Sequence, residues 1–190
     1  MPSELRLIIA PRDTYARLAR GRSPVGPLTA LRRPALVALV LGASEAIAAT
    51  RHVTPGLLLS TTLCWSVVVL LQIAIALSLI AGPSRRTVGP SRAIDLFFAS
   101  HVPWSLWMLA AAAWGPSPMG RSTTPLLVAA AVPAVLTPRM IAAFFREVLE
   151  MDPREARART AAHQAITWGL FAILFGLSVA AVPRIYEWFA

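Results

Sequence analysis

The sequence predicts an all-α, polytopic membrane protein built as a bundle of five transmembrane helices. Three observations predict this fold class: five long apolar stretches between Pro34 and Val182, a composition that is 56% hydrophobic and only 14% charged, and arginines that cluster in alternate loops. Most soluble domains are less apolar than this, and about 20 consecutive apolar residues are enough to cross a bilayer.

The five predicted spans cover residues 34–50, 56–81, 93–114, 125–145 and 161–182. At the rise of an α-helix they are about 25–39 Å long, which matches a hydrocarbon core of about 30 Å. The chain therefore divides into a cytoplasmic N-terminal segment, residues 1–33, and a transmembrane domain, residues 34–190. Pro133 and Pro138 should kink the fourth span, because each removes a backbone hydrogen bond.

The arginines predict the orientation of the chain. All 18 basic residues are arginines; 14 precede the first span or lie in the loops after the second and fourth spans, three lie on the opposite side, and Arg139 lies within a span. The positive-inside rule then gives a cytoplasmic N-terminus and an extracytoplasmic C-terminus. The absence of lysine is typical of a GC-rich, bacterial genome, so we expect a bacterial inner-membrane protein. No nucleic-acid partner is expected, because the arginines flank spans instead of forming a basic soluble face.

The N-terminal segment contains one predicted amphipathic helix, residues 11–20. It begins with proline and stops before Gly21, which is the usual punctuation of a helix. The helix either lies on the anionic inner leaflet or docks against the bundle.

A second cytoplasmic element is predicted between the fourth and fifth spans. Asp152 and Pro153 indicate the start of the fifth helix, with Glu155 completing a capping box and pairing with Arg159. The fourth helix is expected to continue to Glu150, so the two helices form a cytoplasmic hairpin. Contacts to lipid headgroups or to a partner protein are assigned to five arginines of the cytoplasmic face: Arg12, Arg17, Arg20, Arg154 and Arg157.

Polar residues inside the predicted spans need an explanation, because charge at membrane depth is costly. Asp95 and Arg139 both fall in the inner half of the bilayer, so we predict an intramembrane ion pair between them. Glu45 falls in the outer half of the first span and is a candidate proton-relay or ion site. Gln72 and His101 lie at similar inner-half depth and are expected to hydrogen-bond to each other.

No cofactor is predicted from the sequence. The three histidines are expected at three different depths, which excludes a bis-histidine haem, while a single haem or pigment ligand at His101 stays open. The single cysteine, Cys64, provides neither a disulfide nor a cysteine-based metal site. No arrangement of catalytic residues is found, so the chain is expected not to be an enzyme.

Two ladders of small residues predict close helix packing. Small side chains at a spacing of four let helix backbones approach each other, within one chain or between subunits. The two ladders, on the first and fifth spans, are Ala38, Gly42 and Ala46, and Ala172, Gly176 and Ala180.

The layout resembles the Yip-domain family of small five-span membrane proteins. The resemblance rests on the lead-in RLIIAPRDTYARLARG, on the opening DLFFASHVPW of the third span, and on the turn FFREVLEMDPREARA before the fifth. The Asp-Leu-Tyr-Gly-Pro signature of eukaryotic members is absent apart from Asp95-Leu96, so their trafficking role is not carried over. The resemblance implies a non-enzymatic membrane scaffold or adaptor.

Two alternative functions stay open. The first is an accessory subunit of a larger respiratory, photosynthetic or transport complex. The second is a small proton- or ion-coupled transporter or channel. The expected partners are the bilayer with its anionic inner leaflet and other membrane proteins or further copies of the chain.

Overall fold

The computed structural model describes residues 3–21, 26–81, 88–114 and 124–189, with the side chains in these ranges except at positions 3–4, 27, 175 and 178–189. All regular elements in the described ranges are helices, which confirms the all-α fold class. In chain order they are α1 Ser3–Ile9, α2 Pro11–Arg20, α3 Pro27–Ala30, α4 Arg32–Thr50, α5 Pro55–Ile80, α6 Pro90–Phe98, the 3₁₀ turn η2 Ala99–His101, α7 Val102–Trp114, α8 Thr124–Ala129, α9 Ala131–Glu147 and α10 Pro153–Phe189.

Four stretches of the described chain are long and apolar enough to cross a membrane. They are Leu28–Thr50, Pro55–Ile80, Pro90–Trp114 and Thr124–Glu147. They correspond to the first four predicted spans and indicate a multi-pass membrane protein. The fifth predicted span lies within α10, a single helix of 37 residues.

Local sequence signals set the ends of several helices. α5 begins at Pro55, and the preceding Thr54 is its N-cap, with a side-chain oxygen that accepts from the Leu57 amide at 3.3 Å. α2 has the predicted bounds, with a proline at its start and Gly21 after its end. At the other end of α4, Arg51 adopts a left-handed conformation with φ 62°, which terminates the helix before the turn into α5.

Prolines interrupt the third and fourth spans. The 3₁₀ turn η2 separates α6 from α7 just before Pro103, which has no amide hydrogen for the Ala99 carbonyl. The fourth span breaks between α8 and α9 at Ala130, where Pro133 likewise cannot donate to Ala129. The helix thus breaks beside Pro133, whereas Pro138 lies inside α9, and the kink expected at each proline stays a prediction.

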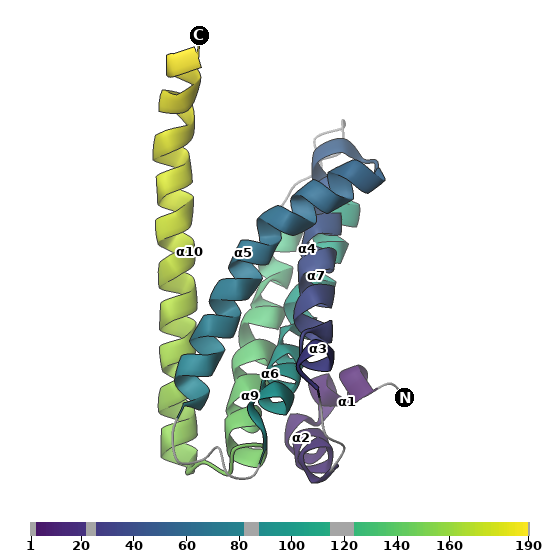
Figure 1. Cartoon of the computed structure of the whole chain (residues 1–190), viewed down its shortest axis with the longest axis vertical. Helices are drawn as coiled ribbons and strands as arrows, with labels where there is room; N and C mark the ends of the chain where they lie inside the picture. Colours follow the sequence, from purple (N-terminus) through teal and green to yellow (C-terminus); the bar gives the residue numbers. More distant parts are fainter. Residues whose placement is uncertain (1–2, 22–25, 82–87, 115–123, 190) are drawn as a thin grey trace.

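The helices form a bundle with a packed core at one end. Figure 1 shows α1, α2, α3 and α6 gathered at the lower end, beside the lower parts of α4 and α9. α10 stands at the edge of the bundle and extends past the other helices at the upper end. The largest buried side chains come from α2, α6 and α9 and include Tyr15, Phe97, Phe98, Phe144 and Phe145. Many leucines along the spans, by contrast, are exposed, as expected for helices that face lipid tails, among them Leu36, Leu59, Leu63, Leu70 and Leu106.

Candidate functional site

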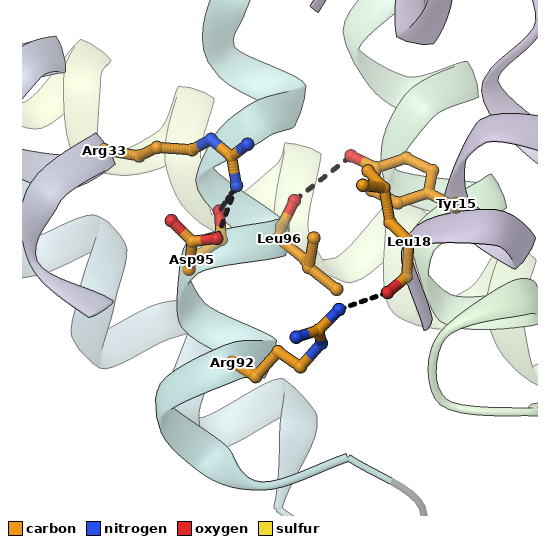
Figure 2. Close-up of polar contacts among 6 residues, drawn as sticks. All are labelled: Tyr15, Leu18, Arg33, Arg92, Asp95 and Leu96. Atoms are coloured by element: carbon orange, nitrogen blue, oxygen red, sulfur yellow. Dashed lines mark hydrogen bonds and ion pairs between the residues drawn. The ribbon is translucent and has the colours of Figure 1, made fainter. Parts of the chain in front are cut away.

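The amphipathic helix α2 docks against the bundle through Tyr15. The Tyr15 side chain is fully buried and its hydroxyl donates to the Leu96 carbonyl oxygen at 3.2 Å (Figure 2). Its ring meets Phe144 edge to face, with 5.9 Å between centroids. Burial raises the pKa of Tyr15 above its ordinary value of 10.0, against the nearby Arg33 guanidinium, which lowers it. Of the two locations predicted for this helix, the structure shows the docked one.

Two arginines connect α6 to its neighbours, as Figure 2 shows. Arg92 on α6 donates to the Leu18 carbonyl oxygen in the last turn of α2, which also accepts from the Gly21 amide at 3.3 Å. Arg33 at the start of α4 forms a salt bridge of 2.5 Å with Asp95 on α6 and also donates to the Asp95 carbonyl oxygen at 3.3 Å. About four fifths of each side chain in this salt bridge is shielded, with 23% of Arg33 and 18% of Asp95 exposed.

The structure contradicts the predicted ion pair between Asp95 and Arg139. Asp95 pairs with Arg33, whereas the Arg139 side chain is exposed on α9. Arg33 lies one residue before the first predicted span and Asp95 lies two residues into the third, so both sit at the same boundary of the bundle. A comparison of the depth of Asp95 with the residues at the ends of the other spans would have predicted Arg33 as its partner.

The hairpin between α9 and α10 agrees with most of its prediction. α10 begins at Pro153, and an oxygen of Asp152 accepts from the Arg154 amide at 2.8 Å. Glu155 pairs with Arg159 at 2.7 Å as predicted, and Arg159 also donates to the Leu79 carbonyl oxygen at the end of α5.

α9 ends at Glu147, earlier than predicted. Glu150 has φ 53°, a left-handed conformation that cannot continue the helix. The Met151 amide still donates to the Phe145 carbonyl oxygen at 3.1 Å, which ties the turn to the end of α9.

The arginines assigned to lipid or partner contacts share one property, which is exposure. α2 buries the side of the helix that carries Tyr15 and exposes its charged side. The first turns of α10 likewise expose their arginines. The exposed set is Arg12, Arg17, Arg20, Arg154 and Arg157.

The two small-residue ladders differ in the structure. Ala38, Gly42 and Ala46 are buried, and a Cβ built on Gly42 would lie 2.7 Å from the Cα of Thr62 on α5. The first ladder therefore packs within the chain. In the second ladder Ala172 and Gly176 are exposed, with nothing within 4 Å of a Cβ on Gly176. The side chain of Ala180 lies outside the described residues.

Polar side chains of α5 and α10 form a chain of hydrogen bonds inside the bundle. Oε1 of Gln72 lies 3.1 Å from Nε2 of His163, and the side-chain amide nitrogen of Gln72 donates to the Thr167 hydroxyl at 3.2 Å. Nδ1 of His163 lies 3.3 Å from the Gln164 amide nitrogen. The prediction that Gln72 bonds to His101 is therefore wrong, since its described partners are on α10.

The histidines also require a correction. His101 and His163 do not lie at separate depths, because their ring centroids are 6.4 Å apart and His163 is buried. Phe98 stacks on His101 at 4.9 Å with 18° between the ring planes. The register of α10 against α7 cannot be predicted from the sequence, and neither can the approach of these two rings.

The remaining predicted residue, Glu45, lies exposed on α4. The residues described by the structure hold no group of three or more His, Cys, Asp and Glu side chains that could bind a metal ion.

Comparison of the chain with protein-family models, with curated proteins and with solved structures finds no match.

Proposed function

We propose that the chain is a non-enzymatic membrane scaffold with five spans that binds other membrane helices along α10. A membrane scaffold or adaptor is the role that the resemblance to Yip-domain proteins implies, and an accessory subunit of a larger complex is the first alternative. The transport alternative has less support, because Glu45 is exposed on α4 and stands apart from the polar side chains in the bundle interior.

The length of α10 and the positions of the two chain ends support the topology in this proposal. A helix of 37 residues is about 55 Å long, which exceeds the hydrocarbon core of about 30 Å. The N-terminal helices and the far end of α10 lie toward opposite ends of the bundle in Figure 1, as an odd number of crossings requires. A reporter enzyme that is active only outside the cytoplasm, fused after Ala190, should be active. The same reporter fused after Ile80 should be inactive.

The exposed ladder on α10 carries the proposal. Gly169 lies on the same helical face as Gly176, and nothing lies within 4 Å of a Cβ built on either residue. Ala165 and Ala172 complete the face, and both are exposed. A helix that faces only lipid has no need of small residues, whereas a helix that packs closely against another helix does. The buried ladder of α4 shows how such a face packs in this chain.

One substitution tests this proposal. Gly176→Leu adds a large side chain to the ladder and should separate the purified full chain from its membrane partner. Leu177→Phe is the matched control, since it also enlarges an exposed apolar residue but lies 100° around the helix. The partners are measured by mild-detergent purification with quantitative mass spectrometry, and self-association by energy transfer between labelled copies in vesicles.

The two measurements separate the forms that the scaffold could take. Loss of a larger membrane protein in Gly176→Leu supports the accessory subunit, and loss of energy transfer supports a self-associating scaffold. If Gly176→Leu and Leu177→Phe behave alike in both measurements, the α10 ladder is not a binding surface and the proposal fails.

A further inference from the structure

The interior of the bundle contains a cavity of about 470 Å³ between α4, α5, α7, α9 and α10. This volume lies in the range of small-molecule sites, which is about 300–1,000 Å³. The walls are mostly apolar and rich in aromatic rings, which come from Trp65, Phe98, Trp104, Trp107, Trp168 and Phe171.

The cavity is accessible from the side of the bundle. Trp168 and Phe171 line it and yet are 49% and 44% exposed, so these two rings, which meet edge to face with 6.4 Å between centroids, border both the cavity and the outer surface of the bundle. Trp104 and Trp168 meet edge to face with 5.7 Å between centroids, and they form one wall from two different helices. A molecule dissolved in the lipid could therefore reach this cavity without crossing the aqueous ends of the bundle.

The hydrogen bonds around His163 fix the direction of every donor. Trp168 donates its indole hydrogen to Oε1 of Gln164, at 3.2 Å. The amide group of Gln164 then donates to Nδ1 of His163, so the ring hydrogen of His163 is on Nε2 and is donated to Gln72. Gln72 donates in turn to the hydroxyl of Thr167. His163 has no ring nitrogen left for a ligand.

His101 and Thr137, by contrast, line the cavity with polar atoms to spare. The Ser100 hydroxyl donates to the Phe97 carbonyl oxygen at 2.7 Å, so toward Nδ1 of His101, 3.4 Å away, it can only accept. The ring hydrogen of a neutral His101 is then on Nδ1, and Nε2 is an acceptor with no described partner. The Thr137 hydroxyl is buried, with 3% of the residue exposed, and has no hydrogen-bond partner among the described residues.

We propose that this cavity binds a lipid-soluble aromatic molecule that carries a ring hydroxyl group, such as a quinol with an apolar tail. The hydroxyl donates to Nε2 of His101, and the Thr137 hydroxyl bonds to a second oxygen on the same ring. The tryptophan and phenylalanine walls pack on the ring, and the tail lies against the partly exposed rings of Trp168 and Phe171. A buried hydroxyl without a partner costs free energy, and this ligand removes that cost at Thr137. The proposal is independent of the scaffold role of α10.

Equilibrium binding of a decyl-chain quinol to the full chain in lipid nanodiscs tests the proposal. One molecule should bind per chain, and the oxidised quinone, which has carbonyls and no ring hydroxyl, should bind about tenfold more weakly, since one hydrogen bond is worth about one factor of ten. His101→Phe keeps the stacking on Phe98, removes the acceptor, and should weaken quinol binding by about tenfold.

Two further variants separate loss of binding from loss of folding. Thr137→Val removes a hydroxyl that has no partner among the described residues, so it should fold at least as well as the wild type and still bind the quinol more weakly. Ser105→Phe fills the cavity and should abolish binding, whereas Ser60→Phe makes the same change at an exposed position of α5 and should not. Equal binding of quinol and quinone, or unchanged binding in both Thr137→Val and Ser105→Phe, overturns the proposal.

Discussion

Gly42→Ala is the substitution for which the structure gives the clearest magnitude. A Cβ on Gly42 would lie 2.4 Å from the Thr62 hydroxyl oxygen and 2.7 Å from both the Cα and the amide nitrogen of Thr62. The hydroxyl could rotate away, but the two backbone atoms can move only with α5 itself. The substitution therefore forces α4 and α5 apart along the closest part of their contact.

The expected loss follows from three contributions. Overpacking of this kind costs about 1–3 kcal/mol. The single hydrogen of the Thr61 hydroxyl is shared between the Gly42 carbonyl oxygen at 2.9 Å and the Leu57 carbonyl oxygen of its own helix at 2.8 Å, so losing the contact between helices costs at most about 0.6 kcal/mol in a membrane. The gain in helix propensity from glycine to alanine offsets about 1 kcal/mol. The net decrease in the free energy of unfolding is therefore up to about 2.6 kcal/mol.

Reversible unfolding of the purified chain in bicelles measures this quantity. Gly169→Ala is the matched control, because it makes the same change on α10 where nothing lies within 4 Å, and it should stabilise the chain by up to about 1 kcal/mol. If Gly42→Ala is as stable as Gly169→Ala, the close approach of α4 and α5 is wrong.

Four further predictions concern the packed end of the bundle. In a double-mutant cycle of unfolding free energies, Asp95→Asn and Arg33→Gln should be coupled by about 1–3 kcal/mol, whereas Asp95→Asn and Arg139→Gln should be additive; the reverse result would restore the pair expected from the sequence. Tyr15→Phe should cost about 1 kcal/mol through its lost hydrogen bond and should release α2 to limited proteolysis; equal cleavage of variant and wild type would contradict the docking. Because the pKa of Tyr15 is raised in the folded chain, its contribution to stability is complete below pH 10.0 and decreases as the pH rises further, a decrease that Tyr15→Phe should lack in alkaline unfolding curves. Glu150→Gly should raise the thermal unfolding temperature by relieving about 1 kcal/mol of left-handed strain, and a lower temperature would contradict this.

The helix ends that the sequence predicted correctly are those set by local chemistry. The bounds of α2 and the start of α10 at Pro153 follow from proline and capping residues, whose effects extend over one helical turn. The break near Pro133 follows from a missing amide hydrogen. The 3₁₀ turn before Pro103 rests on the same chemistry and could have been predicted from it.

The partners across helices were harder to predict, because they depend on how helices cross. The depth of a residue along its span restricts its possible partners but does not give the rotation of the helix. Asp95 was assigned to Arg139 by depth alone, and the rotation of α9 leaves Arg139 exposed. Depth alone likewise separates His163 from His101, although the packing of α10 brings their ring centroids to 6.4 Å from each other. The cavity depends on several crossings at once and had no signal in the sequence.

The hydrogen bond from Arg159 to Leu79 also matters while the chain is being synthesised. The two residues are 80 positions apart, so at about 5–20 residues per second the ribosome needs about 4–16 s to travel from one codon to the other. During that interval the Leu79 carbonyl oxygen at the end of α5 lacks its hydrogen bond from Arg159. Early contacts such as that of α4 with α5 form well before this one, and nascent chains stalled ahead of Arg159 should therefore expose the end of α5 to chaperones and proteases.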